Sequence, residues 1–123
     1  MRKYLFFSFV FLFVILGLSF TQQQKNTNTD NGKNIYNKYC LACHQADGEG
    51  VPHLAPALTQ NEVVQGNAAT LIQIVLQGSK ANWQRNETFA NPMASHAFLT
   101  DADIAAVVTY IRNNFGNKAN AVS

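Results

Sequence analysis

The chain has 123 residues, of which 47% are hydrophobic and 13% are charged, so it has room for one small globular domain and does not resemble a disordered or repetitive chain. Two of its nine basic residues, Arg2 and Lys3, stand at the N-terminus, and the other seven balance the seven acidic residues. Because phosphate binding needs concentrated Lys and Arg, a neutral domain without basic runs predicts no nucleic-acid partner.

Residues 1–20 have the pattern of an export signal. Arg2 and Lys3 precede an apolar run over residues 4–20, and a basic flank before a short apolar core is typical of exported chains. The run is slightly short for a membrane span, yet it lacks an Ala-x-Ala cleavage site. Residues 1–20 are therefore either a signal peptide or a retained N-terminal membrane anchor, and the membrane is a partner only in the second case. Both alternatives place the remaining chain in the periplasm or on the outer face of the cytoplasmic membrane.

The remaining chain divides into a linker, a domain and a tail. Residues 21–31 contain no apolar side chain and are predicted to be a solvated linker. The folded domain is expected over residues 32–116, and residues 117–123 are expected to form a disordered tail.

Apolar side chains recur at helical spacing in three segments of the domain. The first predicted helix covers about 31–43. A second begins after Asn67, a typical N-cap residue, and stops at Gly78. A third begins after Thr100, which forms a capping-box pattern with Asp103, and closes at Gly116. Strand signals are weak and limited to a small hairpin at 83–89, so the pattern predicts an all-α fold.

Two long connections, at about 45–60 and 79–99, separate these helices. Structureless loops of this length are uncommon in a small domain unless they have a function. The apolar faces of three helices also make a thin core for an independent domain. A large apolar ligand enclosed by the loops would explain both features.

The decisive motif is Cys40-Leu41-Ala42-Cys43-His44, which contains both cysteines of the chain. C-x-x-C-H is the pattern of a c-type haem attachment site. Two thiols at this spacing near a helix end can each add to one vinyl group of the same porphyrin, and the adjacent imidazole is then held over the iron. The motif predicts one covalently bound haem c, with Cys40 and Cys43 as attachment residues and His44 as an axial ligand.

Three other uses of the cysteine pair fit less well. A thiol–disulfide redox site is expected in a βαβ setting, whereas this pattern is helical. A zinc site needs two more ligands, and His44, His53 and His96 stand at spacings that match no zinc-finger type. A structural disulfide between residues three apart is strained and stabilises little.

A low-spin electron-transfer haem needs a second axial ligand, for which Met or His is usual. Met1 belongs to the N-terminal segment, which leaves Met93 as the methionine of the domain. Met93 lies in the turn 91–94 rather than on an amphipathic helix, where a gap-filling Met is expected. We therefore expect Met93 to be the sixth ligand, with His53 and His96 as the alternatives.

The domain resembles a class I cytochrome c over residues 32–116. Gly32 and Tyr36 stand eight and four residues before Cys40, where that family has a Gly and an aromatic residue on its first helix. Tyr110 matches the aromatic residue of the last helix. The resemblance implies that this helix crosses the first one at Gly32, because a Cβ there would hold the two helices apart.

The segment 55–58 resembles the Pro-Leu segment that follows the haem motif in the same family. The carbonyl of that proline accepts the second N–H of the axial histidine. The resemblance therefore implies a hydrogen bond between His44 and the carbonyl of Pro56, which would fix the imidazole tautomer and strengthen His44 as a donor.

Residues 93–116 resemble the monohaem domains attached to, or partnered with, periplasmic dehydrogenases and haem–copper oxidases. The resemblance implies a redox partner such as a periplasmic dehydrogenase or a terminal oxidase. That subgroup usually has Pro after the ligand Met, whereas Ala94 and Ser95 follow Met93 here. Relatives use donors of the preceding loop to bind the haem propionates, which implies this role for Trp83 and Arg85. The alternatives are core packing for Trp83 and a solvated charge for Arg85.

The predicted function is that of a monohaem electron carrier, which passes single electrons and does no bond chemistry on a substrate. It is not itself an enzyme, although it can serve as an accessory to a dehydrogenase or terminal oxidase. Its expected docking patch is the haem edge near Leu41, Ala42 and Val51. A second hypothesis is an enzyme or gas sensor with an open iron site, which applies if Met93 does not bind. A third is a haem-free metal or thiol protein.

Overall fold

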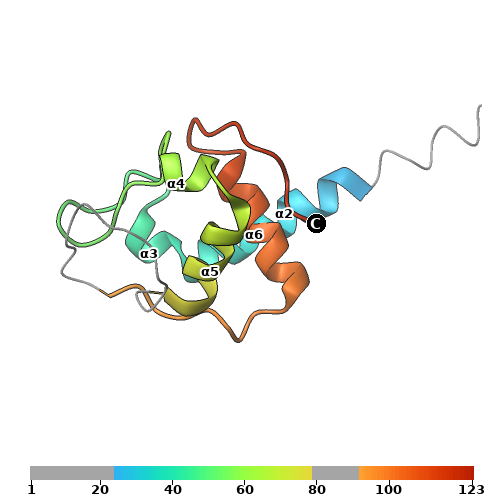
Figure 1. Cartoon of the computed structure of the whole chain (residues 1–123), viewed down its shortest axis with the longest axis horizontal. Helices are drawn as coiled ribbons and strands as arrows, with labels where there is room; N and C mark the ends of the chain where they lie inside the picture. The colour runs from blue at the N-terminus through green and yellow to red at the C-terminus, as the bar shows by residue number, and fades with distance from the viewer. Residues whose placement is uncertain (1–23, 79–91) are drawn as a thin grey trace, which may run out of the picture.

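The computed structural model describes residues 24–78 and 92–123, and this part of the chain is helical (Figure 1). Its helices are α2 (Gln24–Tyr39), α3 (Leu41–His44), α4 (Glu62–Gln65), α5 (Ala68–Gln77) and α6 (Asp101–Arg112). Extended pairing within these two ranges is limited to an isolated bridge between Val51 and Ala55. The predicted all-α fold is confirmed, while the weak hairpin signal at 83–89 lies outside the described residues.

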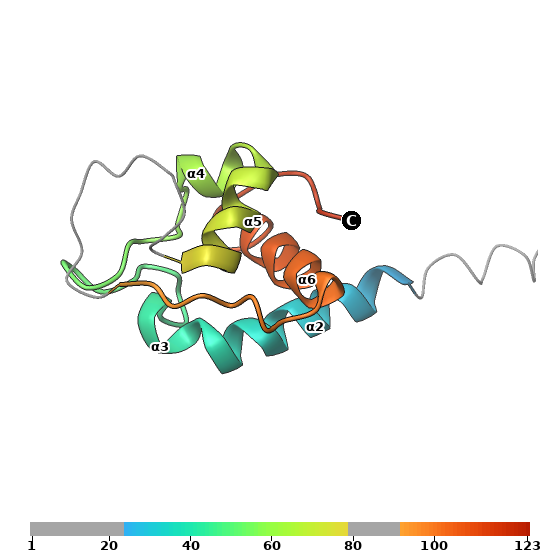
Figure 2. The same cartoon turned by 60° about the horizontal axis from the view of Figure 1, so that its bottom comes forward.

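The close crossing of α2 and α6 organises the domain, as Figure 2 shows from the side. A Cβ on Gly32 would overlap the carbonyl oxygen of Ala106 and lie 2.8 Å from the Cβ of Tyr110, so only glycine fits at this point. One turn further along α2, the buried ring of Tyr36 packs against the rings of Tyr110 and Phe115, with centroids 5.5 Å and 5.1 Å away. The crossing that the family resemblance implies at Gly32 is present.

The structure differs from the predicted linker at 21–31, because α2 already begins at Gln24. Neither Pro nor Gly interrupts residues 24–31. Extending a formed helix adds a hydrogen bond for each residue fixed, so the packed part of α2 propagates helix into the polar sequence before it. Asn31 also contacts the other helix, since its Nδ2 donates to Oδ1 of Asp103 at 3.2 Å.

The N-caps predicted for α5 and α6 are confirmed. Oδ1 of Asn67 accepts from the amide of Ala69 at 2.8 Å, and Oγ1 of Thr100 accepts from the amide of Asp103 at 3.2 Å. The predicted end of the last helix at Gly116 is wrong, because α6 stops at Arg112. Phe115 and Gly116 follow with φ values of 57° and 75°, which turn the chain away from the helix axis.

Residues 117–123, predicted to be a disordered tail, instead run back along α6 (Figure 2). The amide of Ala119 donates to the carbonyl of Arg112 at 3.1 Å. The amide of Val122 donates to Oγ1 of Thr109 at 2.9 Å. The tail is therefore held by polar contacts with the helix that precedes it.

The buried side chain of Arg112 connects this tail to the segment around α4. Its Nη1 donates to the carbonyls of Val64 at 2.7 Å and Gly66 at 2.9 Å, and its Nε donates to the carbonyl of Asn120 at 2.9 Å. A buried cation needs such partners, because an unpaired one would be expensive to remove from water. The guanidinium thus ties α6, α4 and the tail into one unit.

The buried core gathers around α6, which packs against α2, α4 and α5. Its members are Ile35, Tyr36, Val64, Leu71, Val75, Ile104, Ala106, Val107, Val108 and Ile111. Within residues 24–78 and 92–123, no helix has both the length and the apolar character that a membrane span requires. Residues 1–20, predicted as a signal peptide or anchor, lie outside the described ranges.

We expect Gly32→Ala to lower the free energy of unfolding by about 1–3 kcal/mol, because the added methyl group must push α2 and α6 apart. Denaturant titration of the purified holoprotein measures this loss. Lys33→Ala, at the neighbouring exposed position of α2, is the control and should leave the midpoint nearly unchanged. Equal midpoints for the two variants would contradict the tight crossing.

Candidate cofactor site

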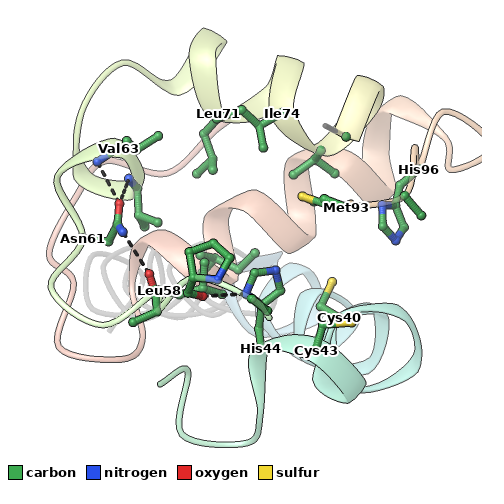
Figure 3. A pocket seen from close by; sticks show the side chains of 18 of the residues that line it. Cys40, Cys43, His44, Leu58, Asn61, Val63, Leu71, Ile74, Met93 and His96 are labelled. Carbon is green, nitrogen blue, oxygen red and sulfur yellow. Dashed lines mark hydrogen bonds between the residues drawn. The ribbon is translucent and has the colours of Figure 1, made fainter. Parts of the chain in front are cut away.

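A cavity of about 740 Å³ opens beside the α2–α6 pair (Figure 3). Its floor is the end of α2 with α3, and α5, α6, the segment 52–64 and the segment 92–99 supply the other walls. The leucine, isoleucine and valine side chains that line it are Leu54, Leu58, Val63, Val64, Leu71, Ile74, Val75, Leu99, Val107 and Ile111. The size is that of a site for one medium-sized organic ligand, and the walls favour a ligand with a large apolar surface.

Both cysteines line this cavity, Cys40 from the turn between α2 and α3 and Cys43 from α3 itself. The amide of Cys40 donates to the carbonyl of Tyr36, and the amide of His44 donates to the carbonyl of Cys40, both at 2.9 Å. The helical path therefore continues through the turn and brings residues three apart onto one side. The two sulfurs are not joined in a disulfide, and Cys43 is the more exposed of the two. The motif presents two thiols to one ligand.

Burial raises the pKa of the Cys40 thiol to about 11, and the neighbouring Cys43 adds to the effect. The cysteines of thiol–disulfide sites have lowered pKa values, because the thiolate is the reactive form. The environment of Cys40 is the opposite of such a site. The helical setting and the raised pKa together disfavour the thiol-redox use of the pair.

His44 is buried at the end of α3, and its Nδ1 lies 3.0 Å from the carbonyl oxygen of Pro56. The hydrogen bond implied by the resemblance is present. Burial lowers the pKa of His44. The hydrogen bond to the Pro56 carbonyl acts in the opposite direction, but the net effect is a lowered pKa. In the neutral tautomer that donates from Nδ1 to Pro56, the lone pair is on Nε2, so this nitrogen is the one free to bind a metal.

Gly50 allows the Pro56 carbonyl to approach His44, although sequence reasoning did not single it out. Its φ is 66°, and a Cβ there would lie 2.5 Å and 2.6 Å from the carbonyl oxygens of Ala55 and Pro56. Its amide donates to the carbonyl of His44 at 3.1 Å. A glycine so close after the haem motif is a signal that could have been read as a tight turn.

The three candidates for a sixth ligand take different positions. Met93 is half-buried, and Figure 3 shows its sulfur inside the cavity, on the side opposite His44. The ring of His96 packs among aromatic rings, 6.3 Å from Tyr39 and 5.8 Å from Phe98. His53 is exposed at the rim. The geometry favours Met93, which is the side chain that faces His44 across the space.

The helix α4 forms part of the cavity wall through Val63 and Val64, and the sequence pattern did not predict this helix. Oδ1 of Asn61 accepts from the amides of Val63 at 2.9 Å and Val64 at 3.2 Å, and its Nδ2 donates to the carbonyl of Ala57 at 2.9 Å (Figure 3). These bonds close the first turn of α4 and place both valines against the cavity. An Asn followed by Glu62 is an N-cap signal, but a helix of four residues carries no readable periodicity.

A haem suits the residues that surround this cavity. The walls are apolar, two free thiols stand at one side, and an imidazole nitrogen and a thioether face each other across the interior. Among the described residues, no group of three or more His, Cys, Asp and Glu side chains gathers to hold a bare metal ion. Trp83 and Arg85, predicted to bind the propionates, lie outside the described residues.

Comparison with known proteins supports this assignment. The model of the cytochrome c family matches residues 29–115. The cytochrome c subunit of an alcohol dehydrogenase (quinone) from Gluconacetobacter polyoxogenes is 37% identical over 98 residues, which are 76% of this chain and 20% of the relative. The chain thus spans about a fifth of the length of that relative.

Two smaller relatives are matched over most of their length. Cytochrome c-552 of Thermus thermophilus is 32% identical over 92 residues, covering 71% of this chain and 70% of the relative. Cytochrome c-555 of Prosthecochloris aestuarii is 29% identical over 83 residues, covering 68% and 84%.

We expect Asn61→Ala to destabilise the holoprotein by about 1–2 kcal/mol, because it removes the cap of α4 and the bond to Ala57 together. Thermal or denaturant unfolding followed by far-ultraviolet circular dichroism measures the change. Asn67→Ala is the matched variant, since that cap accepts from a single amide of α5. A loss for Asn61→Ala no larger than for Asn67→Ala would show that α4 does not depend on this side chain.

Proposed function

This chain belongs to the cytochrome c family, and on that premise we propose that His44 and Met93 are the two axial ligands of its haem iron. As a member of the family the protein binds haem c covalently and transfers electrons as a monohaem cytochrome. The observation that carries the ligand assignment is the shared cavity, in which Met93 and His44 lie on opposite sides.

We assign the attachment of the haem to Cys40 and Cys43. Each thiol would hold the haem by adding across one vinyl double bond, with the sulfur bonded to one carbon and the thiol hydrogen transferred to the other. These two covalent bonds would keep the haem in the protein even when no free haem is present in solution. They would also fix the neighbouring His44, whose ring orientation is set by the Pro56 carbonyl at 3.0 Å.

The bound haem supplies a one-electron couple between ferric and ferrous iron. The protein contributes the ligand set and the surroundings. A His/Met pair raises the reduction potential of a haem relative to ligand sets without the thioether. Buried aliphatic side chains around the site, among them Val64 and Val107, exclude water. With His44 and Met93 both bound, the iron would keep the same ligands when it is oxidised and reduced, and this small rearrangement would favour electron transfer over chemistry on a substrate.

We expect Met93→Ala to abolish the methionine-to-iron charge-transfer band of the ferric protein and to lower its reduction potential. Carbon monoxide should bind rapidly to the reduced variant and slowly to the unmodified protein, because a ligated sixth position resists exogenous ligands. Visible spectroscopy and stopped-flow mixing measure these effects. Fast carbon monoxide binding by the unmodified protein would instead support an open iron site of the sensor or enzyme kind.

The proposed partners are redox proteins of the cell envelope, such as a periplasmic dehydrogenase or a terminal oxidase. Support for the dehydrogenase comes from relatives that are cytochrome subunits of alcohol, fructose and gluconate dehydrogenases. Export to the periplasm or to the outer face of the cytoplasmic membrane is supported by the basic and apolar pattern of residues 1–20.

We propose a docking surface made by Leu41 and Phe98. Leu41 is 36% exposed and Phe98 is 64% exposed. Large apolar side chains exposed to water favour the binding of a transient partner that covers them. The Phe98 ring lies 5.2 Å from that of Tyr39, which lines the cavity next to Cys40. The surface includes Leu41 of the predicted patch at 41, 42 and 51 and adds Phe98, which sequence reasoning missed.

We expect Phe98→Ala to slow electron self-exchange between oxidised and reduced copies by about tenfold, because a central apolar contact of the encounter is lost. Line broadening in proton NMR spectra of mixed oxidation states measures the rate without a known partner. Reduction by ascorbate and the reduction potential should stay unchanged, since neither needs protein docking. An unaltered self-exchange rate would exclude Phe98 from the docking surface.

A further inference from the structure

We propose that Ser95 is a positioning residue for Met93, which ties the ligand segment to the end of α5 and thereby keeps the sixth position closed. The inference rests on the proposed role of Met93 as an iron ligand. It concerns the two residues after that ligand, where the chain departs from the Met-Pro pattern of similar domains.

The hydroxyl of Ser95 makes the direct contact. It donates to the carbonyl of Leu76, in the last turn of α5, at 2.6 Å. It also accepts from the amide of Ala97 at 3.4 Å. The last carbonyls of a helix have no partner within the helix, so the end of α5 offers acceptors to a segment that passes close by.

The backbone of the same segment makes a second bond to this turn. The amide of His96 donates to the carbonyl of Val75 at 3.0 Å. Val75 itself is buried and lines the cavity that also contains the Met93 side chain. Ser95 and His96, the second and third residues after the ligand, are therefore bonded to two successive carbonyls of α5.

Gly78 makes the close approach of the two segments feasible. Its φ is 61°, and a Cβ there would overlap the carbonyl oxygen of Met93 and lie 2.7 Å from the carbonyl carbon and oxygen of Ala94. The end of α5 thus contacts the Met93 backbone directly and bonds to the segment that follows. The backbone of Met93 is therefore packed against the end of α5.

The hydrogen bonds of Ser95 and His96 to α5 restrict the segment after Met93, as a proline at position 94 would. A proline after the ligand restricts the backbone on both sides of its peptide bond, which lowers the entropy of the open loop. Ala94 lacks that restriction, so the open state is populated more unless contacts hold the closed one. Because Ser95 is exposed, its loss should cost little global stability, and its effect should appear in the local opening of the Met93 segment.

The experiment is an imidazole titration of the ferric holoprotein, followed by loss of the methionine-to-iron charge-transfer band. Imidazole binds only when Met93 leaves the iron, so its apparent affinity reports the population of the open segment. We expect Ser95→Ala to bind imidazole about three- to tenfold more tightly, the effect of one hydrogen bond on this equilibrium. Ser95→Thr, which keeps the hydroxyl, should stay within about twofold of the unmodified protein.

Thr109→Val is the matched control for removal of a hydroxyl. Oγ1 of Thr109 also bridges a carbonyl and an amide, both of Val122, at 3.2 Å and 2.9 Å, and neither residue lines the cavity that contains Met93. It should leave the imidazole affinity unchanged. An unchanged affinity in Ser95→Ala, or an equal gain in Thr109→Val, would overturn the positioning role of Ser95.

The ligand role of Met93 and the positioning role of Ser95 are contradicted by different results. If the unmodified ferric protein lacks the charge-transfer band, Met93 is not the ligand and both proposals fall together. If the band is present and Ser95→Ala behaves as the unmodified protein does, the axial pair stands and the role of Ser95 alone is excluded.

Discussion

The contact between α2 and α6 at Gly32 is the constraint on which the rest of the structure depends. It places the Tyr36 ring beneath α6 and sets the direction in which the end of α2 delivers Cys40. The same contact fixes the faces of α6 that carry Val107 and Ile111 into the cavity wall. Because Gly32 has no side chain, the two helices can touch at this point. This contact positions both the proposed attachment motif and the wall opposite it.

The cavity is part of the core rather than an addition to it. Val64, Leu71, Val75, Val107 and Ile111 belong to the buried cluster and also line the cavity. In a domain this small, apolar helix faces bury too little surface against one another to be stable alone. A covalent haem held by these side chains would complete the core, so the group that carries the electron would also supply apolar contacts for folding.

Local patterns in the sequence were enough to predict the helices that carry caps and the motif that carries the chemistry. Asn67 and Thr100 marked the starts of α5 and α6, and Cys43 and His44 marked the proposed attachment site, because each signal lies within a few residues. The order of the tail was not predictable in this way. It depends on bonds to segments distant in sequence, such as those from the Lys118 amide to Oε1 of Gln65 and from Nδ2 of Asn117 to the Leu58 carbonyl, which no local pattern reveals.

The central claim is that one imidazole and one thioether hold the iron from opposite sides, and iron K-edge X-ray absorption of the ferric holoprotein tests it most directly. The account predicts that a single sulfur, contributed by Met93, joins the four porphyrin nitrogens and the His44 nitrogen in the first coordination shell. A shell that is fitted by nitrogen and oxygen neighbours alone would contradict it.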